Sequence, residues 1–303
     1  MKVLLIICGG VGDLIHFTGI LQHIKIEYSH FKFDVLCKKN QSFVLKNNPN
    51  VEKILILEDY VPGDFSTNKN PSTSDEREEE IKEKFKNDYN TILNLSSKKD
   101  ITEISEKIKG RFSVIDFLKI VMTKRGFPTK APLKDMHPIF YFDYEDYIKA
   151  QELYKEIKYS VGSDLFVCLF EDESYSFPSK EQKQTNNVLK IWMKSGYANR
   201  LVGNKKRYIS VGNASTNDFQ TNHLSIKQLK IFFEKYGDYY FGMFSGITAG
   251  LTALPADFSK KRAITNISGL LYGESHYPYL ENGFETRINN YSMDDCLNLL
   301  KAR

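Results

Sequence analysis

The sequence has few cysteines and no long apolar run, and each shortage argues against a class of protein. The four cysteines are spread along the chain, and no two of them form a C-x-x-C pair. This spacing argues against a disulfide framework and against a zinc site, and it favours buried thiols. The apolar run at the start, Val3–Cys8, is too short for the core of a signal peptide or for a bilayer span. We therefore expect a cytoplasmic protein.

Signals for metal ions and nucleic acids are also missing. The six histidines show no H-E-x-x-H spacing, and no two aspartates form a D-x-D pair. The net charge of +4 is modest for 303 residues, so we expect no nucleic-acid partner. We expect the chain to use neither a metal ion nor a cofactor.

Strand and helix patterns alternate along the whole chain, whose length of 303 residues favours two domains. Strand-like runs lie at 2–8, 33–37, 51–57, 91–95, 164–170, 207–211, 239–241 and 262–267. Helical patterns lie at 14–28, 41–46, 76–87, 116–126, 141–158, 187–195, 225–236, 242–254 and 292–303. This alternation predicts an α/β fold of two doubly wound, Rossmann-like domains, 1–160 and 161–303, with a terminal helix able to pack back on the first.

A basic stretch lies between Ser179 and Arg207, where eight basic residues stand against the single acid Glu181. Such a stretch could hold phosphates or contact an anionic membrane from the cytoplasmic side. A solvated lysine-rich face explains the same residues equally well.

The glycine turn Cys8-Gly-Gly-Val-Gly-Asp13 lies where the first strand meets the first helix. Ligands of open α/β sheets bind at this kind of junction. The turn is not a complete dinucleotide fingerprint, because Ile15 stands where the last glycine belongs and Cys37-Lys38-Lys39 follows the second strand instead of an acid. A nicotinamide-dependent oxidoreductase is therefore weakly supported, and the absence of a Walker lysine excludes a P-loop.

Asp13 is the most informative residue of this turn, and it has two interpretations. It can cap the first helix, as acidic residues at this position often do. It can also accept a proton from a substrate, and the helix N-terminus would then keep it ionised with a lowered pKa, which weakens it as a base.

A resemblance to a known family favours the second interpretation. Gly-Gly-Val-Gly-Asp-Leu-Ile at positions 9–15, Thr18-Gly19 and Asn48-Pro49-Asn50-Val51 resemble the start of the lipopolysaccharide heptosyltransferases, which are inverting glycosyltransferases. The resemblance implies a GT-B fold, with two Rossmann-like domains facing a central cleft and metal-independent chemistry. It implies that Asp13 is the catalytic base. We expect Gly10, Gly12 and His16, which lie at the same turn, near the acceptor, although a lone helical histidine is more often packed or solvated.

The second half is similar to the donor-binding part of the same family, with two departures. The run from Asp238 to Leu254 resembles a strand, a D-S-G-x-x-H motif and a helix, but Phe244 replaces the aspartate and Ala249 the histidine. The departures put heptose in doubt as the transferred sugar. We expect the donor at Gly212, Asn213, Ser245, Gly246 and Thr248, with Lys180 or Lys183 at the phosphates.

The resemblance implies transfer of a sugar from a nucleotide-diphosphate sugar to a hydroxyl of a surface glycan or its lipid-linked precursor. The partners implied are that donor and a glycan or glycolipid acceptor of the lipopolysaccharide, lipooligosaccharide or capsule type. The departures at Phe244 and Ala249 leave an alternative open, a GT-B-like binding subunit that has lost catalysis.

Overall fold

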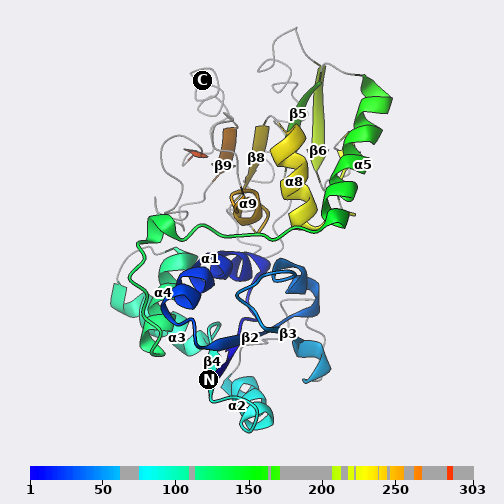
Figure 1. Cartoon of the computed structure of the whole chain (residues 1–303). Helices are drawn as coiled ribbons and strands as arrows, with labels where there is room; N and C mark the ends of the chain where they lie inside the picture. The colour runs from blue at the N-terminus through cyan, green and yellow to red at the C-terminus, as the bar shows by residue number, and fades with distance from the viewer. Residues whose placement is uncertain are drawn as a thin grey trace. The chain divides into compact units, whose positions relative to one another are not determined.

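The structure is a computed structural model that describes residues 1–61, 75–108, 113–162, 165–170, 207–212, 218–221, 223–237, 239–243, 246–255, 263–267 and 285–288. The chain forms two compact units (Figure 1). The first contains Met1–Phe142 and Ala253–Pro255, and the second contains Asp143–Thr252 and the strands that follow.

The first unit is built on a four-stranded parallel sheet in the order β3-β2-β1-β4. The strands are β1 (Lys2–Ile6), β2 (Lys32–Cys37), β3 (Lys53–Ile56) and β4 (Thr91–Asn94). The helices are α1 (Val11–Glu27), α2 (Asp75–Phe85), α3 (Lys98–Ile108) and α4 (Val114–Lys124), with the short 3₁₀ helices η1 (Lys39–Val44), η2 (Leu57–Asp59) and η3 (Leu133–Asp135).

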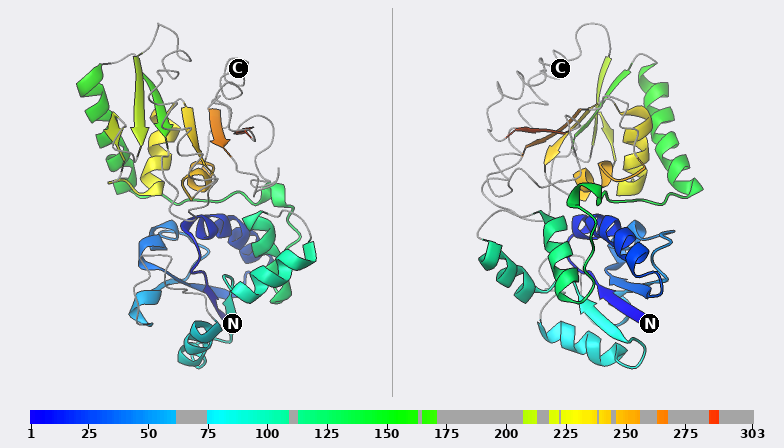
Figure 2. Two further views of the ribbon diagram at one scale, coloured as in Figure 1. Left: turned by 180° about the vertical axis from the view of Figure 1, so that it is seen from behind. Right: turned by 60° about the vertical axis from the view of Figure 1, so that its left-hand side comes forward.

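The core of this unit follows from the two-residue period of β1. Leu4, Ile6 and Cys8 lie in one buried cluster with Ile81 and Phe85 of α2. The residues between them point to the other face of the sheet. α1 and α2 lie on opposite sides of the sheet in both figures (Figures 1 and 2), so β1 is buried on both faces, as its unbroken apolar run predicts.

The second unit contains a six-stranded parallel sheet in the order β10-β9-β8-β5-β6-β7. Its strands are β5 (Leu165–Phe170), β6 (Arg207–Gly212), β7 (Phe219–Gln220), β8 (Tyr239–Met243), β9 (Ala263–Ile267) and β10 (Glu285–Ile288). Its helices are α5 (Tyr144–Val161), α8 (Ile226–Tyr236) and α9 (Gly246–Leu251). Numbered from β5, the sheet has the strand order 3-2-1-4-5-6 of Rossmann domains, which confirms the predicted fold class.

The long helix α5 belongs with the second unit because it packs on α8 (Figure 1). The Tyr154 ring stacks on Tyr236 with the centroids 3.9 Å apart, and Lys227 Nζ lies 3.4 Å from Asp146 Oδ2. From the sequence this helix was expected in the first domain, with the boundary after it, whereas the contacts place the boundary before it, between Phe142 and Asp143.

Most predicted elements are present, but some ends and some elements differ. α1 begins at Val11 instead of Leu14, so Asp13 lies inside the first turn. The predicted helix at 41–46 is the 3₁₀ helix η1, and α3, β7 and β10 were not predicted. The predicted helices at 187–195 and 292–303 lie outside the described residues, as does the basic stretch up to residue 206.

Candidate active site

The glycine turn after β1 brings the Asp13 carboxylate back onto the backbone. Asp13 Oδ2 accepts a hydrogen bond of 2.7 Å from the Gly10 N–H. A Cβ on Gly9 would collide with this same oxygen, so only glycine lets the carboxylate approach so closely. Asp13 therefore caps α1 from within its first turn, and its side chain remains half-buried rather than sealed from solvent.

The electrostatics of Asp13 differ from the expectation drawn from the helix end. Burial raises the pKa of Asp13 above its ordinary value, and the Gly10 N–H and the charge of Lys38 oppose this only in part. The predicted lowering of the pKa was wrong, because desolvation outweighs the hydrogen bond from Gly10 and the charge of Lys38. A carboxylate with a raised pKa is the stronger proton acceptor.

Two residues after β2, Lys38 and Gln41, also act on the turn, and this role was not predicted from the sequence. Gln41 Nε2 donates a 2.8 Å hydrogen bond to the Gly9 carbonyl. Lys38 is buried, and its charge acts on Asp13. The available signal was their position after a parallel neighbour of β1, because the carboxyl ends of parallel strands share one edge of a sheet.

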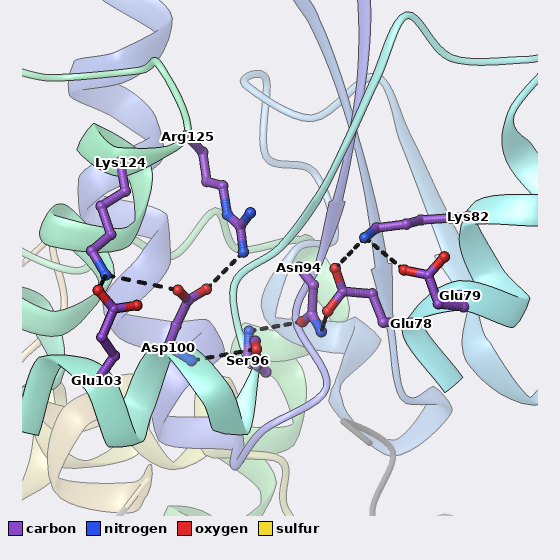
Figure 3. A network of polar contacts seen from close by, with 10 residues as sticks. Glu78, Glu79, Lys82, Asn94, Ser96, Asp100, Glu103, Lys124 and Arg125 are labelled. Carbon is purple, nitrogen blue, oxygen red and sulfur yellow. Dashed lines mark hydrogen bonds and ion pairs between the residues drawn. The ribbon is translucent and has the colours of Figure 1, made fainter. Parts of the chain in front are cut away.

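A polar network around Ser96, Asn94 and Glu78 (Figure 3) reaches the turn from the side of β4. The Cys8 N–H donates to Ser96 Oγ at 3.2 Å, and the Ser96 N–H donates to Asn94 Oδ1 at 3.0 Å. Asn94 Nδ2 donates in turn to Glu78 Oε2 at 2.8 Å, and Lys82 pairs with Glu78 at 2.7 Å. The turn is thus fixed on both sides, at the point where the strand order reverses between β1 and β4.

The remaining acceptor candidates lie close to Asp13 in the chain but differ in exposure. Gly10 is exposed and Gly12 half-buried, whereas His16 is buried within α1. The first two can therefore be reached by a ligand, and the His16 ring packs in the interior.

The donor candidates are described only in part. Gly212 ends β6 and is buried, and Gly246 begins α9 directly after β8. Thr248 lies on α9, and its side chain is not described. Lys180, Lys183, Asn213 and Ser245 lie outside the described residues, as does Phe244.

α9 is anchored by a buried lysine from α8. Lys230 Nζ donates to the Leu251 carbonyl at 2.7 Å and pairs with Glu234 at 2.9 Å. A cation at the last carbonyls of a helix complements the helix dipole. Ala249, which stands where the family that the sequence resembles has histidine, is completely buried on this helix and offers no polar atom from its side chain.

The described residues contain neither a metal-binding cluster nor a membrane span. No group of three or more His, Cys, Asp or Glu side chains among them is placed to hold a metal ion. Within the same part of the chain, no helix is both long and apolar enough to cross a membrane.

Comparison with solved structures identifies the fold. No protein-family model matches the sequence, and no curated protein does. A glycosyl transferase of family 9 from Veillonella parvula matches 99% of this chain and 88% of its own, at 13% identity and a TM-score of 0.60. This chain has the GT-B fold.

Two enzymes from E. coli have the same GT-B fold. ADP-heptose lps heptosyltransferase II matches 95% of this chain and 90% of its own, at 13% identity and a TM-score of 0.57. Heptosyltransferase WaaC, solved with ADP, matches 100% of this chain and 98% of its own, at 9% identity and a TM-score of 0.50. The resemblance seen in the sequence is thus confirmed at the level of the fold.

Proposed function

We propose that this protein is an inverting glycosyltransferase that moves a sugar from a nucleoside-diphosphate sugar to a hydroxyl group of a surface glycan or its lipid-linked precursor. The observation that carries the proposal is the Asp13 carboxylate, which is half-buried with a raised pKa on the turn after β1 of a GT-B fold. A carboxylate that only capped a helix would not need the support that the turn receives from Gln41 and Ser96.

In the proposed reaction Asp13 accepts the proton of the acceptor hydroxyl group. The acceptor oxygen attacks the anomeric carbon from the face opposite the nucleotide, and the nucleoside diphosphate leaves. Gly10 and Gly12 would lie beside the acceptor because neither has a side chain to exclude it. General-base catalysis of this kind contributes about 10²- to 10⁴-fold in rate.

The donor would bind to the second unit, near the reversal of strand order between β5 and β8. Gly212, Asn213, Ser245, Gly246 and Thr248 are the proposed donor residues, with Lys180 or Lys183 at the phosphates. The solved structures of WaaC with ADP and with ADP-2-deoxy-2-fluoro heptose support a nucleotide donor for proteins of this fold. Metal independence and peripheral contact with an anionic membrane are further parts of the proposal.

The deciding experiment compares wild type with Asp13→Asn against a panel of nucleoside diphosphates and their sugars. We expect saturable calorimetric binding of one nucleoside diphosphate by both proteins, and a turnover about 10²- to 10⁴-fold lower in the variant. Asp59→Asn is the control, because Asp59 is an exposed carboxylate on η2. If Asp13→Asn retained the turnover of wild type, Asp13 would not be the catalytic base.

Ala249 supports a second candidate, a GT-B-like subunit that binds nucleotide without transferring a sugar. It leaves α9 without the polar ring that the family has at this position. Nucleotide binding without product from any donor and acceptor pair would favour this subunit. Product with inverted anomeric configuration, identified by proton NMR, would exclude it.

A further inference from the structure

The segment Lys38–Gln41 lies directly beside the glycine turn. β2 runs parallel to β1 with Ile6 opposite Leu36, and the Ile7 N–H donates to the Leu36 carbonyl at 2.9 Å. The next residues of the two strands therefore leave the sheet together. The residues after β1 form the turn that carries Asp13, and the residues after β2 form η1.

Gln41 holds this turn through a buried amide. Its side chain is only 5% exposed, and its Nε2 donates to the Gly9 carbonyl at 2.8 Å. The orientation of the amide is fixed by chemistry, because a carbonyl oxygen accepts and only the NH₂ group can donate to it. Gly9 is the residue whose missing Cβ makes room for the Asp13 carboxylate. A shift of the Gly9 backbone would therefore displace the carboxylate.

The Lys38–Gln41 segment is itself held by hydrogen bonds, so it can fix the position of the glycine turn. The Gln41 N–H donates to the Lys38 carbonyl at 3.0 Å. The Lys39 N–H donates to both carboxylate oxygens of Glu58, at 3.1 and 2.9 Å. Lys38 and Gln41 are therefore presented from one short rigid turn rather than from a mobile loop.

Lys38 places a positive charge near the glycine turn. The neighbouring titratable groups considered next add no second positive charge there. Cys8 and Cys37 remain neutral thiols, because burial raises the pKa of both, that of Cys37 to about 12. The Glu58 side chain accepts a hydrogen bond from the Lys39 N–H, and the His16 ring is buried on α1. Lys38 is 6% exposed, so its field at Asp13 is weakly screened by water.

We propose that Lys38 and Gln41 are positioning residues for Asp13, in which Gln41 fixes the turn through Gly9 and Lys38 stabilises the charged carboxylate. The contribution of these two residues to catalysis rests on the proposed function. Their effect on the position and charge of Asp13 does not depend on that function. Lys38 favours the charged form of the Asp13 carboxylate, which can then act as a base although the carboxylate is partly desolvated. Gln41 keeps this carboxylate in its orientation.

The test of Lys38 follows the titration of Asp13 in the free protein by carboxyl ¹³C NMR, with Asp13→Asn assigning the signal. We expect Lys38→Gln to raise the midpoint and Lys38→Arg to keep it near that of wild type. Lys39→Gln is the matched control, because it removes an equal charge from the exposed neighbour. Equal midpoints in Lys38→Gln and Lys39→Gln, with both proteins folded by thermal melting, would overturn the role of Lys38.

Gln41 is tested by Gln41→Leu against Asn40→Ala, which truncates the exposed amide next to it. We expect Gln41→Leu to raise the Asp13 midpoint, because the Gly10 N–H then loses its alignment with the carboxylate. Where turnover is measurable, kcat should fall about tenfold with little change in the donor KM. An unchanged midpoint in Gln41→Leu would refute the proposal for Gln41. Absence of turnover with shifted midpoints would refute the proposed function and leave the positioning roles standing.

Discussion

At the scale of single residues, ionisation of the desolvated Asp13 carboxyl group lowers the stability of the fold. Its carboxylate is held against the Gly10 N–H, yet burial keeps its pKa raised, so folding favours the protonated form. A group with a raised pKa stabilises the fold most below its ordinary pKa, here 3.8, and loses that contribution as the pH rises through the folded pKa.

Asp13→Asn should therefore be more stable than wild type at neutral pH. The amide oxygen can still accept from Gly10, and the cost of ionising a desolvated carboxyl group is removed. The difference in the free energy of unfolding should grow as the pH rises above 3.8 and level off once the pH exceeds the raised pKa, which urea unfolding at several pH values measures. Parallel stability curves for wild type and Asp13→Asn would contradict the raised pKa.

At the scale of elements, α2 is tied to β4 through one carboxylate (Figure 3). Burial acts to raise the pKa of Glu78, but the hydrogen bonds from Lys82 and Asn94 outweigh it and leave this pKa below its ordinary value. The stability that Glu78 contributes is thus present above pH 4.5 and is lost as the pH falls through the lowered pKa.

Glu78→Gln should destabilise the protein by about 1–3 kcal/mol at neutral pH, and the loss should shrink in acid. Glu79→Gln is the matched control, because Glu79 also contacts Lys82, at 3.1 Å, but its side chain is 75% exposed. Chemical unfolding at pH 7 and pH 4 distinguishes the two variants. A loss of equal size at both pH values would show that Glu78 acts by packing alone.

α1 is also joined to the end of the first unit by a close backbone contact. The Ile139 N–H donates to Thr18 Oγ1 at 2.8 Å, and Thr18 Oγ1 donates to the Ile15 carbonyl at 2.7 Å. A Cβ on Gly19 would collide with the backbone carbonyl of His137. The Thr18-Gly19 pair of the sequence resemblance thus has a packing role that the sequence did not reveal.

Gly19→Ala should destabilise the protein by about 1–3 kcal/mol, although alanine favours helix by about 1 kcal/mol. The obstacle is backbone rather than a flexible side chain, so it cannot move aside easily. Gln22→Ala, three residues further along α1 and only half-buried, should change the melting temperature little. A higher melting temperature for Gly19→Ala would show that this contact is not tight.

At the scale of the whole molecule, the GT-B fold is present at 9–13% identity to its solved neighbours. Few side chains need to be shared, because parallel sheets require buried apolar strands and turns at their ends rather than particular residues. A shared fold does not specify a ligand, so ligand binding is the test of the proposed nucleotide donor.

A nucleoside diphosphate that binds the folded chain should stabilise it. At a ligand concentration 100 times the Kd, the free energy of unfolding should rise by about 2.7 kcal/mol. Thermal unfolding measures this rise, and Asp13→Asn should show it equally, because Asp13 is proposed to contact the acceptor. If none of the nucleotides tested raises the melting temperature, the assignment of a donor site in the second unit fails.

The sequence by itself determined the βα alternation and the position of Asp13, because buried parallel strands and glycine turns are local patterns. It did not predict α3 or β10, and it gave the pKa of Asp13 the wrong direction. Gln41 and Ser96 reach the turn only after β2 and β4 have paired with β1. Burial and contacts between distant segments exist only in the folded chain, so the tertiary structure alone decided how the carboxylate is held and charged.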